Sequence, residues 1–260
     1  MNPLKKLRST FQHHLGISEL LALSRDLHAA QVFHDRILDS PWFTQQRLSP
    51  GNYAVDYGFL KTLYNVLSAM QPRNILEFGL GQSSKLVHQY ATHFGANALT
   101  CENSDDWISF FFKSENPTTM PVRPSMSADS PVVVDSSLGY PVNIRRLPLA
   151  KIKIRGILTT SYQDIETVFA DQRFDFILVD GPYGEERFSR PQIITLAEHN
   201  LANRFCILVD DSQRPGEQET IAEVESVLRR QNIPFVAATH AFSKSHTLIL
   251  SPSLHFLGTT

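Results

Sequence analysis

The chain has 260 residues, of which 42% are hydrophobic and 19% are charged, and its formal net charge at pH 7 is −2. This composition excludes an intrinsically disordered chain, and it provides no basic surplus, so we expect no nucleic-acid partner. The two cysteines, Cys101 and Cys206, lie in apolar runs, which argues against a disulfide framework and indicates a reducing, cytoplasmic location. No stretch of about eighteen apolar residues is present, so we expect no transmembrane helix.

The first 50 residues predict a helical extension. Over residues 17–40 apolar side chains recur at helical spacing, and Ser40-Pro41 ends the run. The segment carries no chemical signature. We expect it to pack on the remaining domain, residues 51–260, or on a second subunit of a homo-oligomer.

From residue 51 onward helical and strand patterns alternate. The first half of this domain reads, in chain order, as helix "AVDYGFLKTLYNVLSAM", strand "NILEFG", helix "KLVHQYATHF", strand "ALTCE" and helix "SDDWISFFF", with Ser104 as the N-cap. Residues 113–141 are rich in Pro, Ser and Thr, which indicates an insertion or a lid over the site. The segments "VNIRRLPL" and "KIKIRGILTT" follow as two strands joined in a hairpin.

The second half of the domain continues the alternation. It reads as short helix "DIETVFA", strand "FDFILVD", helix "RPQIITLAEHNL", strand "RFCILVDD", helix "EQETIAEVESVLRRQN" and a closing strand pair, "PFVAATHAF" and "SHTLILSP". Continuous apolar strands that alternate with helices predict an α/β fold with a parallel sheet covered on both faces. Only a few residues separate the last two strands, so they must be antiparallel.

The stretch "LEFGLGQSS" places Glu77, Gly79 and Gly81 at the exit of the domain's first strand. Glycines let the backbone turn tightly and let a ligand approach it, and the next helix offers free N–H groups. Glu102 ends the second strand, where a carboxylate can accept both hydroxyl hydrogen bonds of a ribose. Dinucleotides and S-adenosylmethionine (SAM) both use this geometry. Ser84 stands where dinucleotide sites have a third glycine, and Glu77 suits the cationic aminoacyl part of SAM, so the pattern favours SAM.

The segment from Tyr53 to Leu250 resembles the class I SAM-dependent methyltransferases, through "ILEFGLGQSS", "LTCE", "FDFILVDGP" and "CILVDD". The resemblance implies a Rossmann-like seven-stranded sheet of order 3-2-1-4-5-7-6, with strand 7 antiparallel and helices on both faces. Gln and Ser follow the second glycine where many family members keep a glycine. The residues that the resemblance places at the cofactor are Glu77, as the first-motif acid, Gly79, Gly81, Ser83 and Glu102.

Three aspartates follow two apolar strands: Asp180 ends "FDFILVD", and the pair Asp210 and Asp211 ends "CILVDD". Ligands of an open parallel sheet bind beyond the carboxyl ends of its strands, so we expect these carboxylates to converge near the methyl group of SAM. Hard oxygen ligands suit Mg²⁺, Mn²⁺ or Ca²⁺, and such a cation would relieve the repulsion between adjacent carboxylates. It would also lower the pKa of a substrate hydroxyl, whose oxygen would then attack the methyl. Alternatively, one of the pair caps the turn "DSQRPG".

The same aspartates resemble those of the macrocin-type sugar O-methyltransferases, which carry Asp and then Asp-Asp at the two strand ends. A second resemblance is to the plant glucuronoxylan 4-O-methyltransferases, which share "FGLG", an acid followed by a Trp as in "ENSDDW", and the layout of "DGPYG" and "FSRPQ". Both resemblances imply a carbohydrate hydroxyl as the acceptor. By position they make Asp180, Asp210 and Asp211 the metal ligands, with Asp180 and Asp210 at the reacting centre.

The segment "GPYGEERFSRP" joins the first of these strands to the next helix and should lie over the acceptor. Tyr183 is a candidate for assisting proton removal or for stacking on a sugar, and otherwise an exposed loop aromatic. Arg187 and Arg190 are candidates for binding a carboxylate or phosphate of the substrate. The alternative for the arginines is a salt bridge to Glu185 or Glu186.

Three functions are compatible with these patterns. The first is a SAM-dependent O-methyltransferase for a sugar or related small molecule, assisted by a divalent cation. The second is an NAD(P)-dependent oxidoreductase, against which the missing third glycine and the terminal hairpin argue. The third is a non-catalytic Rossmann-like binding module, against which the intact glycines and carboxylates argue. The sequence therefore predicts an enzyme of the first kind.

Overall fold

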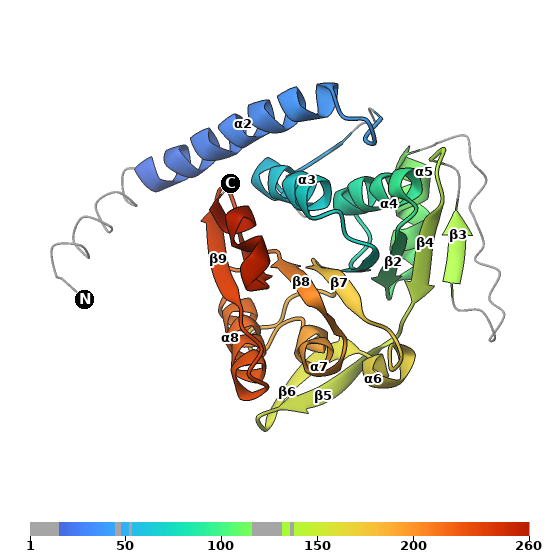
Figure 1. The fold of residues 1–260 in the computed structure, drawn as a ribbon, viewed down its shortest axis with the longest axis vertical. Coiled ribbons are helices and arrows are strands. Elements are labelled where there is room, and N and C mark those ends of the chain that lie inside the picture. Colours follow the sequence, from blue (N-terminus) through green and yellow to red (C-terminus); the bar gives the residue numbers. More distant parts are fainter. Residues whose placement is uncertain (1–15, 45–47, 52–53, 116–131, 136–137, 260) are drawn as a thin grey trace, which may run out of the picture.

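An eight-stranded sheet organises the chain (Figure 1). From edge to edge its strands are β3 (Val132–Asp135), β4 (Val142–Arg146), β2 (Asn97–Glu102), β1 (Asn74–Phe78), β7 (Phe174–Val179), β8 (Leu201–Val209), β10 (Ser245–Leu250) and β9 (Val236–Ala241). The structure is a computed structural model, and it describes residues 16–44, 48–51, 54–115, 132–135 and 138–259.

The strand order confirms the predicted topology. The seven strands from β4 to β9 run in the order 3-2-1-4-5-7-6, and β10, the seventh of them in the chain, is antiparallel to both of its neighbours. The strands β4, β2, β1, β7 and β8 are all parallel. One strand was not predicted: β3 pairs antiparallel with β4 at the sheet edge, within the segment 113–141.

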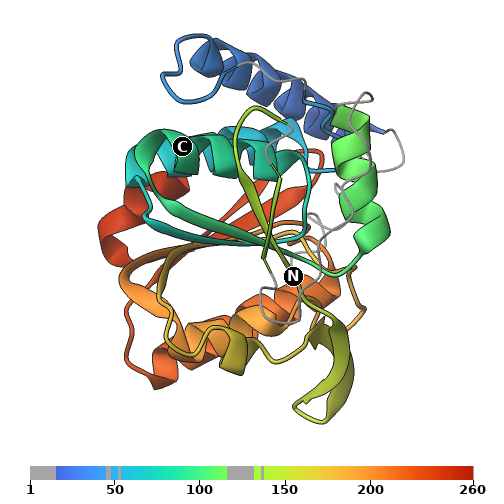
Figure 2. The same cartoon turned by 90° about the vertical axis from the view of Figure 1, so that its right-hand side faces the viewer.

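Helices cover both faces of the sheet, as predicted (Figure 2). The first layer consists of α3 (Tyr57–Met70), α4 (Gln82–Phe94) and the 3₁₀ helix η1 (Pro252–Thr259). The second layer consists of α6 (Ile165–Val168), α7 (Gln192–His199) and α8 (Pro215–Arg230). Alternate side chains of each strand enter the two cores: Phe176 and Leu178 of β7 pack in the first layer, Ile177 and Val179 in the second. Both faces are therefore apolar, which explains the continuous hydrophobic runs of β7 and β8.

Two further helices complete the fold. Helix α5 (Asp105–Glu115) follows Ser104, whose hydroxyl accepts a hydrogen bond from the Trp107 N–H at 3.1 Å, so the predicted N-cap is confirmed. Helix α2 (Ile17–Leu38) lies outside α3 (Figures 1 and 2), where helical spacing predicted it. Its buried residues Ala29, Phe33 and Ile37 share one face, and the ring of Phe33 contacts those of Tyr57 and Tyr64.

The predicted hairpin between the strands "VNIRRLPL" and "KIKIRGILTT" was wrong, because these two segments do not pair with each other. Strand β4, from "VNIRRLPL", joins the main sheet parallel to β2, while "KIKIRGILTT" forms a hairpin by itself, β5 (Leu149–Ile154) with β6 (Ile157–Tyr162). The turn between them is Arg155-Gly156, and both residues have positive φ, 49° and 83°. Two such residues in succession match the twist of a tight hairpin, a signal that reading the segment as one strand overlooked.

Within the segment 113–141, residues 116–131 and 136–137 lie outside the described residues. Its role as a lid remains a prediction, and so does the division at residue 50. Both cysteines are buried thiols. No helix in the described part of the chain is long and apolar enough to cross a membrane.

Candidate functional site

The glycine turn lies at the carboxyl end of β1, in the middle of the sheet. Gly79 follows the strand with φ 96°, a conformation that favours glycine, and its N–H donates to the Cys101 carbonyl of β2 at 2.9 Å. Gly81 is the N-cap of α4 and has an extended backbone that any residue can adopt. A Cβ added to Gly81 would meet no atom within 4 Å, so open space lies beside this turn. That space is where a ligand can approach the α4 N-terminus.

The glycine turn touches the loop that carries Asp180. A Cβ on Gly79 would lie 2.9 Å from the Gly181 nitrogen, and a Cβ on Gly181 would lie 2.8 Å from the Gly79 Cα. These distances are shorter than carbon and nitrogen atoms tolerate, so both positions require glycine. The backbone N–H of Asp180 also donates to the Phe78 carbonyl at 2.9 Å. The predicted cofactor turn and the loop that carries the predicted acid cluster are therefore in direct contact.

Glu77 and Ser83 lie beneath the turn, and both side chains are fully buried. The Ser83 hydroxyl donates to Oε1 of Glu77 and the Thr100 hydroxyl donates to Oε2, each at 2.6 Å. Burial raises the pKa of Glu77 to about 7, although these hydrogen bonds oppose the rise. The structure thus joins the two residues to each other and places them behind the turn.

Glu102 lies at the end of β2 with its carboxylate held by backbone N–H groups. Oε2 accepts from Leu80 of the glycine turn at 3.1 Å, and Oε1 accepts from Asn103 at 2.7 Å and Ser104 at 3.0 Å. Oε1 therefore already accepts two hydrogen bonds, whereas Oε2 accepts one and can accept a further one. Backbone N–H groups of the glycine turn and of the residues after β2 thus hold the Glu102 carboxylate in place beside the turn.

An aromatic pair on α5 borders the same turn, and sequence reasoning gave it no role. The indole N–H of Trp107 donates to the Leu80 carbonyl at 2.6 Å, and its ring stacks on Phe110 with centroids 5.4 Å apart. Both rings are partly exposed. The spacing i, i+3 on a helix was the available signal that the two side chains meet.

The three aspartates converge at the neighbouring strand ends. One carboxylate oxygen from each of Asp180, Asp210 and Asp211 lies within 4.8 Å of the other two. The alignment follows from the sheet, because the Asp210 N–H donates to the Val179 carbonyl at 3.0 Å, one residue before Asp180. Asp211 leaves the strand with φ 57°, a rare conformation for a residue with a side chain. This kink turns the second carboxylate of the pair toward the same space.

Several of these oxygens are buried without hydrogen-bond partners among the described residues. They are both oxygens of Asp210 and Oδ1 of Asp211. A buried acceptor that lacks a donor loses solvation without compensation. Burial, followed by the repulsion from Asp180 and Asp211, raises the pKa of Asp210 well above its usual range. Burial also raises the pKa of Asp180 to about 6, and the neighbouring Arg190 opposes that rise.

Arg190 lies inside this cluster, with a side chain only 4% exposed. Its guanidinium contacts Asp211 Oδ2 at 3.1 Å and Asp180 Oδ1 at 3.5 Å, and it donates to the Pro182 and Asp210 carbonyls, both at 3.2 Å. Like Asp211, it has a positive φ, 55°. The structure therefore places Arg190 among the aspartates, and the alternative partners Glu185 and Glu186 are wrong for it.

Three further charged residues surround the cluster, and sequence reasoning missed all three. Arg214 lies 3.0 Å from Asp211 Oδ2, and Lys244 lies 3.9 Å from Asp211 Oδ1 while its ammonium donates to the Ala54 carbonyl at 2.8 Å. Glu217 is fully buried, accepts from the Ser189 hydroxyl at 2.9 Å and lies 3.7 Å from Arg190. Glu217 looked like an ordinary first-turn acid of α8, because its burial depends on a loop about 30 residues earlier in the chain.

The other two predicted loop residues lie on the surface. The Tyr183 side chain is 87% exposed. Arg187 is exposed and forms an ion pair with Glu219 of α8 at 2.6 Å, so its predicted alternative partners, Glu185 and Glu186, are also wrong. Glu185 instead pairs with Lys151 of β5 at 2.9 Å. The hairpin β5–β6 thereby lies beside the loop that follows Asp180.

The cluster fits a divalent cation by its chemistry. A cation that takes oxygen ligands could be bound by both oxygens of Asp210, which accept no hydrogen bond, and by Oδ1 of Asp211, which the Lys244 ammonium approaches to 3.9 Å. Arg190 and Arg214 contact Oδ2 of Asp211 and leave Oδ1 without a hydrogen bond. The three aspartates can thus hold a cation while the arginines remain in place.

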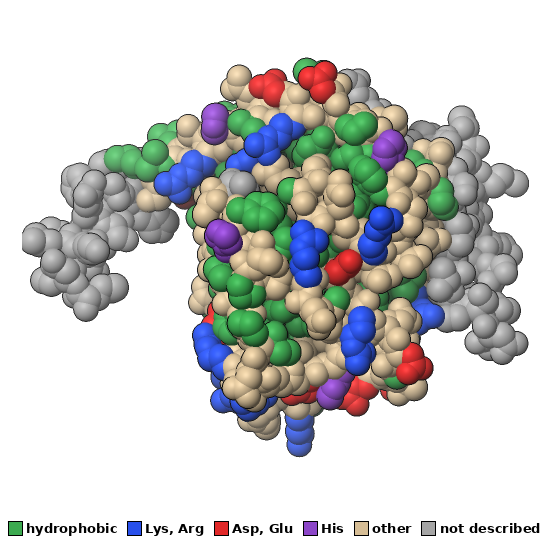
Figure 3. Space-filling view, in the orientation of Figure 1, with side chains coloured by type: hydrophobic (Ala, Val, Ile, Leu, Met, Phe, Trp, Pro, Cys, Tyr) green, Lys and Arg blue, Asp and Glu red, His purple; other side chains and the backbone are tan. Residues whose placement is uncertain are grey.

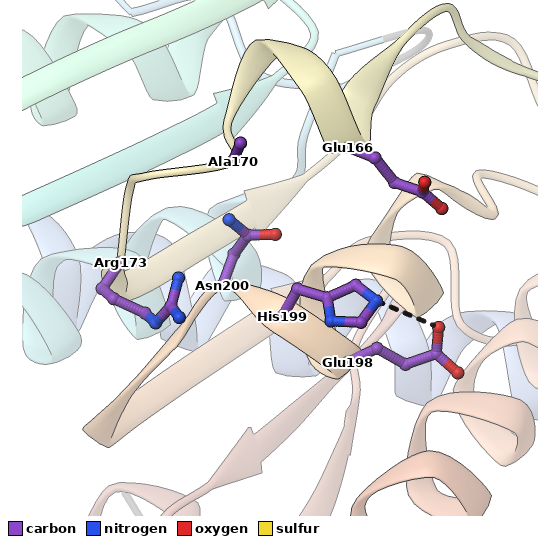
Figure 4. A pocket seen from close by; sticks show the side chains of 6 residues that line it. All are labelled: Glu166, Ala170, Arg173, Glu198, His199 and Asn200. Carbon is purple, nitrogen blue, oxygen red and sulfur yellow. Dashed lines mark ion pairs between the residues drawn. The ribbon is translucent and has the colours of Figure 1, made fainter.

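A separate cavity of about 370 Å³ opens at the opposite end of the sheet (Figure 4). Arg173 and Asn200 immediately precede β7 and β8, whereas the aspartates follow these strands. On one wall of the cavity the ring of His199 lies 3.8 Å from the carboxylate of its neighbour Glu198 (Figure 4). No predicted site residue lines this cavity, so a substitution of one of its lining residues, such as Glu166, is a suitable control for substitutions at the candidate site.

Comparisons with known proteins found distant structural likenesses. The SAH-bound methyltransferase PaMTH1 from Podospora anserina is 12% identical, with 86% of each chain covered and a TM-score of 0.42. A Staphylococcus aureus protein provisionally named as a caffeoyl-CoA O-methyltransferase is 11% identical, with 96% of this chain and 100% of that chain covered and a TM-score of 0.42. No family model and no curated protein matches the chain. Likenesses this distant assign neither a family nor an activity.

Proposed function

We propose that this protein is a SAM-dependent methyltransferase that methylates a hydroxyl of a sugar or related small molecule, with a divalent cation at the three aspartates. One observation carries the proposal. Buried carboxylate oxygens of Asp210 and Asp211 that accept no hydrogen bond converge with Asp180 at the strand ends, in contact with a glycine turn that has open space beside it. Methyl transfer to a hydroxyl needs the two parts together, one for the methyl donor and one for the acceptor oxygen.

The glycine turn and Glu102 would bind the cofactor. Close approach to the backbone at Gly81 is open, and the α4 N-terminus presents N–H groups there. Oε2 of Glu102, which accepts one hydrogen bond from the turn, would accept a ribose hydroxyl. Glu77 and Ser83 would act from behind by holding the turn, since they bond to each other.

Asp180, Asp210 and Asp211 would hold the cation. When bound, such an ion supplies Lewis acidity that lowers the pKa of an acceptor hydroxyl. Asp180 is the most accessible of the three, with a side chain 19% exposed, and its pKa of about 6 leaves its carboxylate largely ionised at pH 7.5. Its carboxylate would therefore accept the hydroxyl proton, with Asp210 beside it at the reacting centre.

Tyr183 and Arg187 would contact the acceptor outside the cluster. Both lie on the loop after Asp180, and both are exposed. An exposed phenol suits stacking on a sugar ring, and Arg187 can exchange its surface partner Glu219 for an anionic group of a substrate. Arg190 would act differently from the prediction, since it contacts the aspartates themselves and would hold them in position.

A nicotinamide cofactor fits the same turn less well. Ser84, at the place of the third glycine, is buried and its hydroxyl accepts from the Gly81 N–H at 3.0 Å. A serine there keeps the helix farther from the strand than glycine does. The acid Glu77 beneath the turn also disfavours a pyrophosphate.

The experiment is equilibrium dialysis of the purified chain with radiolabelled SAM, followed by methyl transfer to a panel of monosaccharides, uronic acids and catechols with Mg²⁺ or EDTA. We expect micromolar SAM binding, at least tenfold weaker in Glu102→Gln, and label transfer that EDTA abolishes. Glu166→Gln, at the cavity on the opposite end of the sheet, is the matched charge control and should bind SAM as the wild type does.

The possible failures point to different conclusions. Absence of SAM binding at millimolar concentration together with NADH binding would favour the oxidoreductase. SAM binding with no transfer to any acceptor would leave the binding module. Transfer that is unchanged by EDTA would remove the cation from the mechanism while keeping the methyltransferase.

A further inference from the structure

Lys244 lies in the turn between β9 and β10, and hydrogen bonds hold this turn on two sides. On one side the Lys244 N–H donates to Oδ2 of Asp56, the N-cap of α3, at 2.8 Å. On the other side the carbonyl of Ser245 accepts from the Ser212 N–H, also at 2.8 Å. The backbone of Lys244 is therefore fixed beside the loop that follows Asp211.

The Lys244 side chain extends from this turn to the acid cluster, and it is only 18% exposed. By contrast, the lysine and arginine side chains seen in Figure 3 are spread over the surface of the molecule. The Lys244 ammonium donates to the Ala54 carbonyl at 2.8 Å and lies 3.9 Å from Oδ1 of Asp211. This carboxylate oxygen accepts no hydrogen bond from the described residues. A fixed positive charge thus lies beside an oxygen that is a candidate metal ligand.

Contacts between charged side chains join Lys244 to one largely buried network. Its members among the described residues are the acids Asp180, Asp210, Asp211 and Glu217 and the bases Arg190, Arg214 and Lys244. With every acid ionised, four negative charges face three positive ones, which leaves one negative charge. A divalent cation would add two positive charges, and it binds its carboxylate ligands in their ionised form. The loaded network would then have one positive charge in surplus, which opposes binding of the cation.

Lys244 contributes to this surplus at short range. A cation bonded to Oδ1 of Asp211 at about 2.1 Å would lie within about 6 Å of the ammonium, because 3.9 Å separates that oxygen from the nitrogen. Positive charges this close, away from bulk solvent, repel each other strongly. The ammonium also opposes the rise that burial causes in the pKa of Asp180 and of Asp210, so its field reaches all three aspartates.

We infer that Lys244 is a positioning residue that acts as the counter-ion of Asp211 and competes with the divalent cation for that carboxylate. The competition lowers the affinity of the cluster for the cation, so that the cation exchanges readily. Because the Ala54 carbonyl retains the ammonium, the lysine opposes the cation without leaving the site. This inference rests on the cation of the proposed function, and it identifies the residue that sets the affinity for that cation.

Electron paramagnetic resonance of free Mn²⁺ measures this affinity and needs no turnover. We expect Lys244→Met to bind Mn²⁺ at least about tenfold more tightly than the wild type, because the loaded network is then balanced in charge. Lys244→Arg keeps the charge and should bind like the wild type. A residue that only supported the fold would lower the affinity when replaced. Lys153→Met is the matched control, since it removes an exposed lysine charge from β5 and should leave Mn²⁺ binding unchanged.

Lys244→Gln is a second neutral variant, in case Lys244→Met does not fold. Its amide keeps an N–H donor for the Ala54 carbonyl, and it should also bind Mn²⁺ more tightly than the wild type. Binding by a neutral variant alone would likewise support the competition.

Two results would overturn the inference, and they differ in what they leave standing. If the wild type binds Mn²⁺ and the neutral variants bind it equally or more weakly, Lys244 does not compete, and the cation of the proposed function remains. If no chain binds Mn²⁺ at millimolar concentration, the inference and the cation both fail, whereas dialysis with SAM still tests the methyltransferase.

Discussion

Oδ2 of Asp211 lies 3.1 Å from the guanidinium of Arg190, and each side chain is only 4% exposed. This buried pair sits at the centre of the acid cluster, and Asp180 and Glu217 also lie within 4 Å of the same guanidinium. A buried charge without its partner is costly, so the aspartates depend on Arg190 for their arrangement. The first prediction follows from this contact.

Arg190→Ala should lower the free energy of unfolding by about 3–5 kcal/mol, because it leaves buried carboxylates without their shared cation. Arg190→Lys should recover only part of the loss, since an ammonium cannot bond to several oxygens in one plane. Urea denaturation at pH 7.5 measures both. Arg187→Ala is the control: it removes an exposed ion pair with Glu219 and should cost less than about 1 kcal/mol. Equal losses for positions 187 and 190 would contradict the buried role of Arg190.

Asp210→Asn should change stability and metal binding in opposite directions. Without a metal the variant should be more stable at pH 8 by on the order of 1 kcal/mol, because it removes a buried carboxylate whose pKa is raised. The gain should shrink as the pH falls and vanish below the unfolded-state pKa of 3.8, where Asp210 is protonated in both folded and unfolded chains. The thermal stabilisation that Mn²⁺ gives the wild type should meanwhile need at least tenfold more Mn²⁺.

The control for this variant is Asp106→Asn on the exposed side of α5, which should leave both the stability and the Mn²⁺ response unchanged. An Asp210→Asn chain that binds Mn²⁺ as the wild type does would remove Asp210 from the ligand set. A loss of stability at pH 8 would mean that the burial of the ionised Asp210 carboxylate does not destabilise the folded chain.

Glu77 predicts a pH dependence of stability. Its pKa rises from 4.5 in the unfolded chain to about 7 in the folded one, so the folded state holds the proton more tightly. The contribution of protonated Glu77 to the free energy of unfolding is therefore greatest below pH 4.5 and is lost as the pH rises to about 7. Glu77→Gln keeps a neutral side chain at every pH, so its stability relative to the wild type should increase by roughly 2–3 kcal/mol between pH 5 and pH 8.

Urea denaturation at the two pH values gives the difference. Glu225→Gln, in an exposed pair with Arg229 on α8, should show no such trend. A flat difference between Glu77→Gln and the wild type would mean that Glu77 ionises normally in the folded chain.

Alanine at the two turn glycines should separate folding from ligand binding. Gly79→Ala places a Cβ 2.9 Å from the Gly181 nitrogen in a left-handed backbone, so it should cost at least about 2 kcal/mol of stability. Gly81→Ala enters open space with an extended backbone and should change stability by less than about 0.5 kcal/mol. It should nevertheless weaken SAM binding in dialysis by tenfold or more, because the methyl group occupies the space left for the ligand. Unaltered SAM affinity in Gly81→Ala would place the ligand elsewhere.

Much of the fold could be predicted because its signals are local. The apolar runs that end at Asp180 and at Asp210 identify strands buried on both faces, and the short spacing of the last two strands fixes their antiparallel pairing. The hairpin β5–β6 was misread because its signal is only the dipeptide Arg155-Gly156 inside an otherwise continuous strand pattern. Strand β3 lies in a segment whose composition suggests a loop.

The site was predictable in its position and less so in its internal contacts. The sheet brings strand ends together, so the convergence of the aspartates with the glycine turn follows from topology. The burial of Arg190 depends on Glu217 of α8 and on a kink at Asp211, which are tertiary features. Lys244 reaches the cluster from the last hairpin turn, more than 30 residues after Asp211, and no local pattern indicates that contact.

The reciprocal contact of Gly79 and Gly181 has a consequence for how this protein can change over evolution. The backbone at each position leaves no room for a Cβ at the other. A change at one position therefore requires a change in the backbone at the other, and the two positions should covary. Among relatives that keep this fold, a glycine at 181 should accompany a glycine at 79, and a chain that has lost one should have remodelled the loop of the other. The glycine turn after β1 and the loop that follows Asp180 are therefore inherited as a single unit.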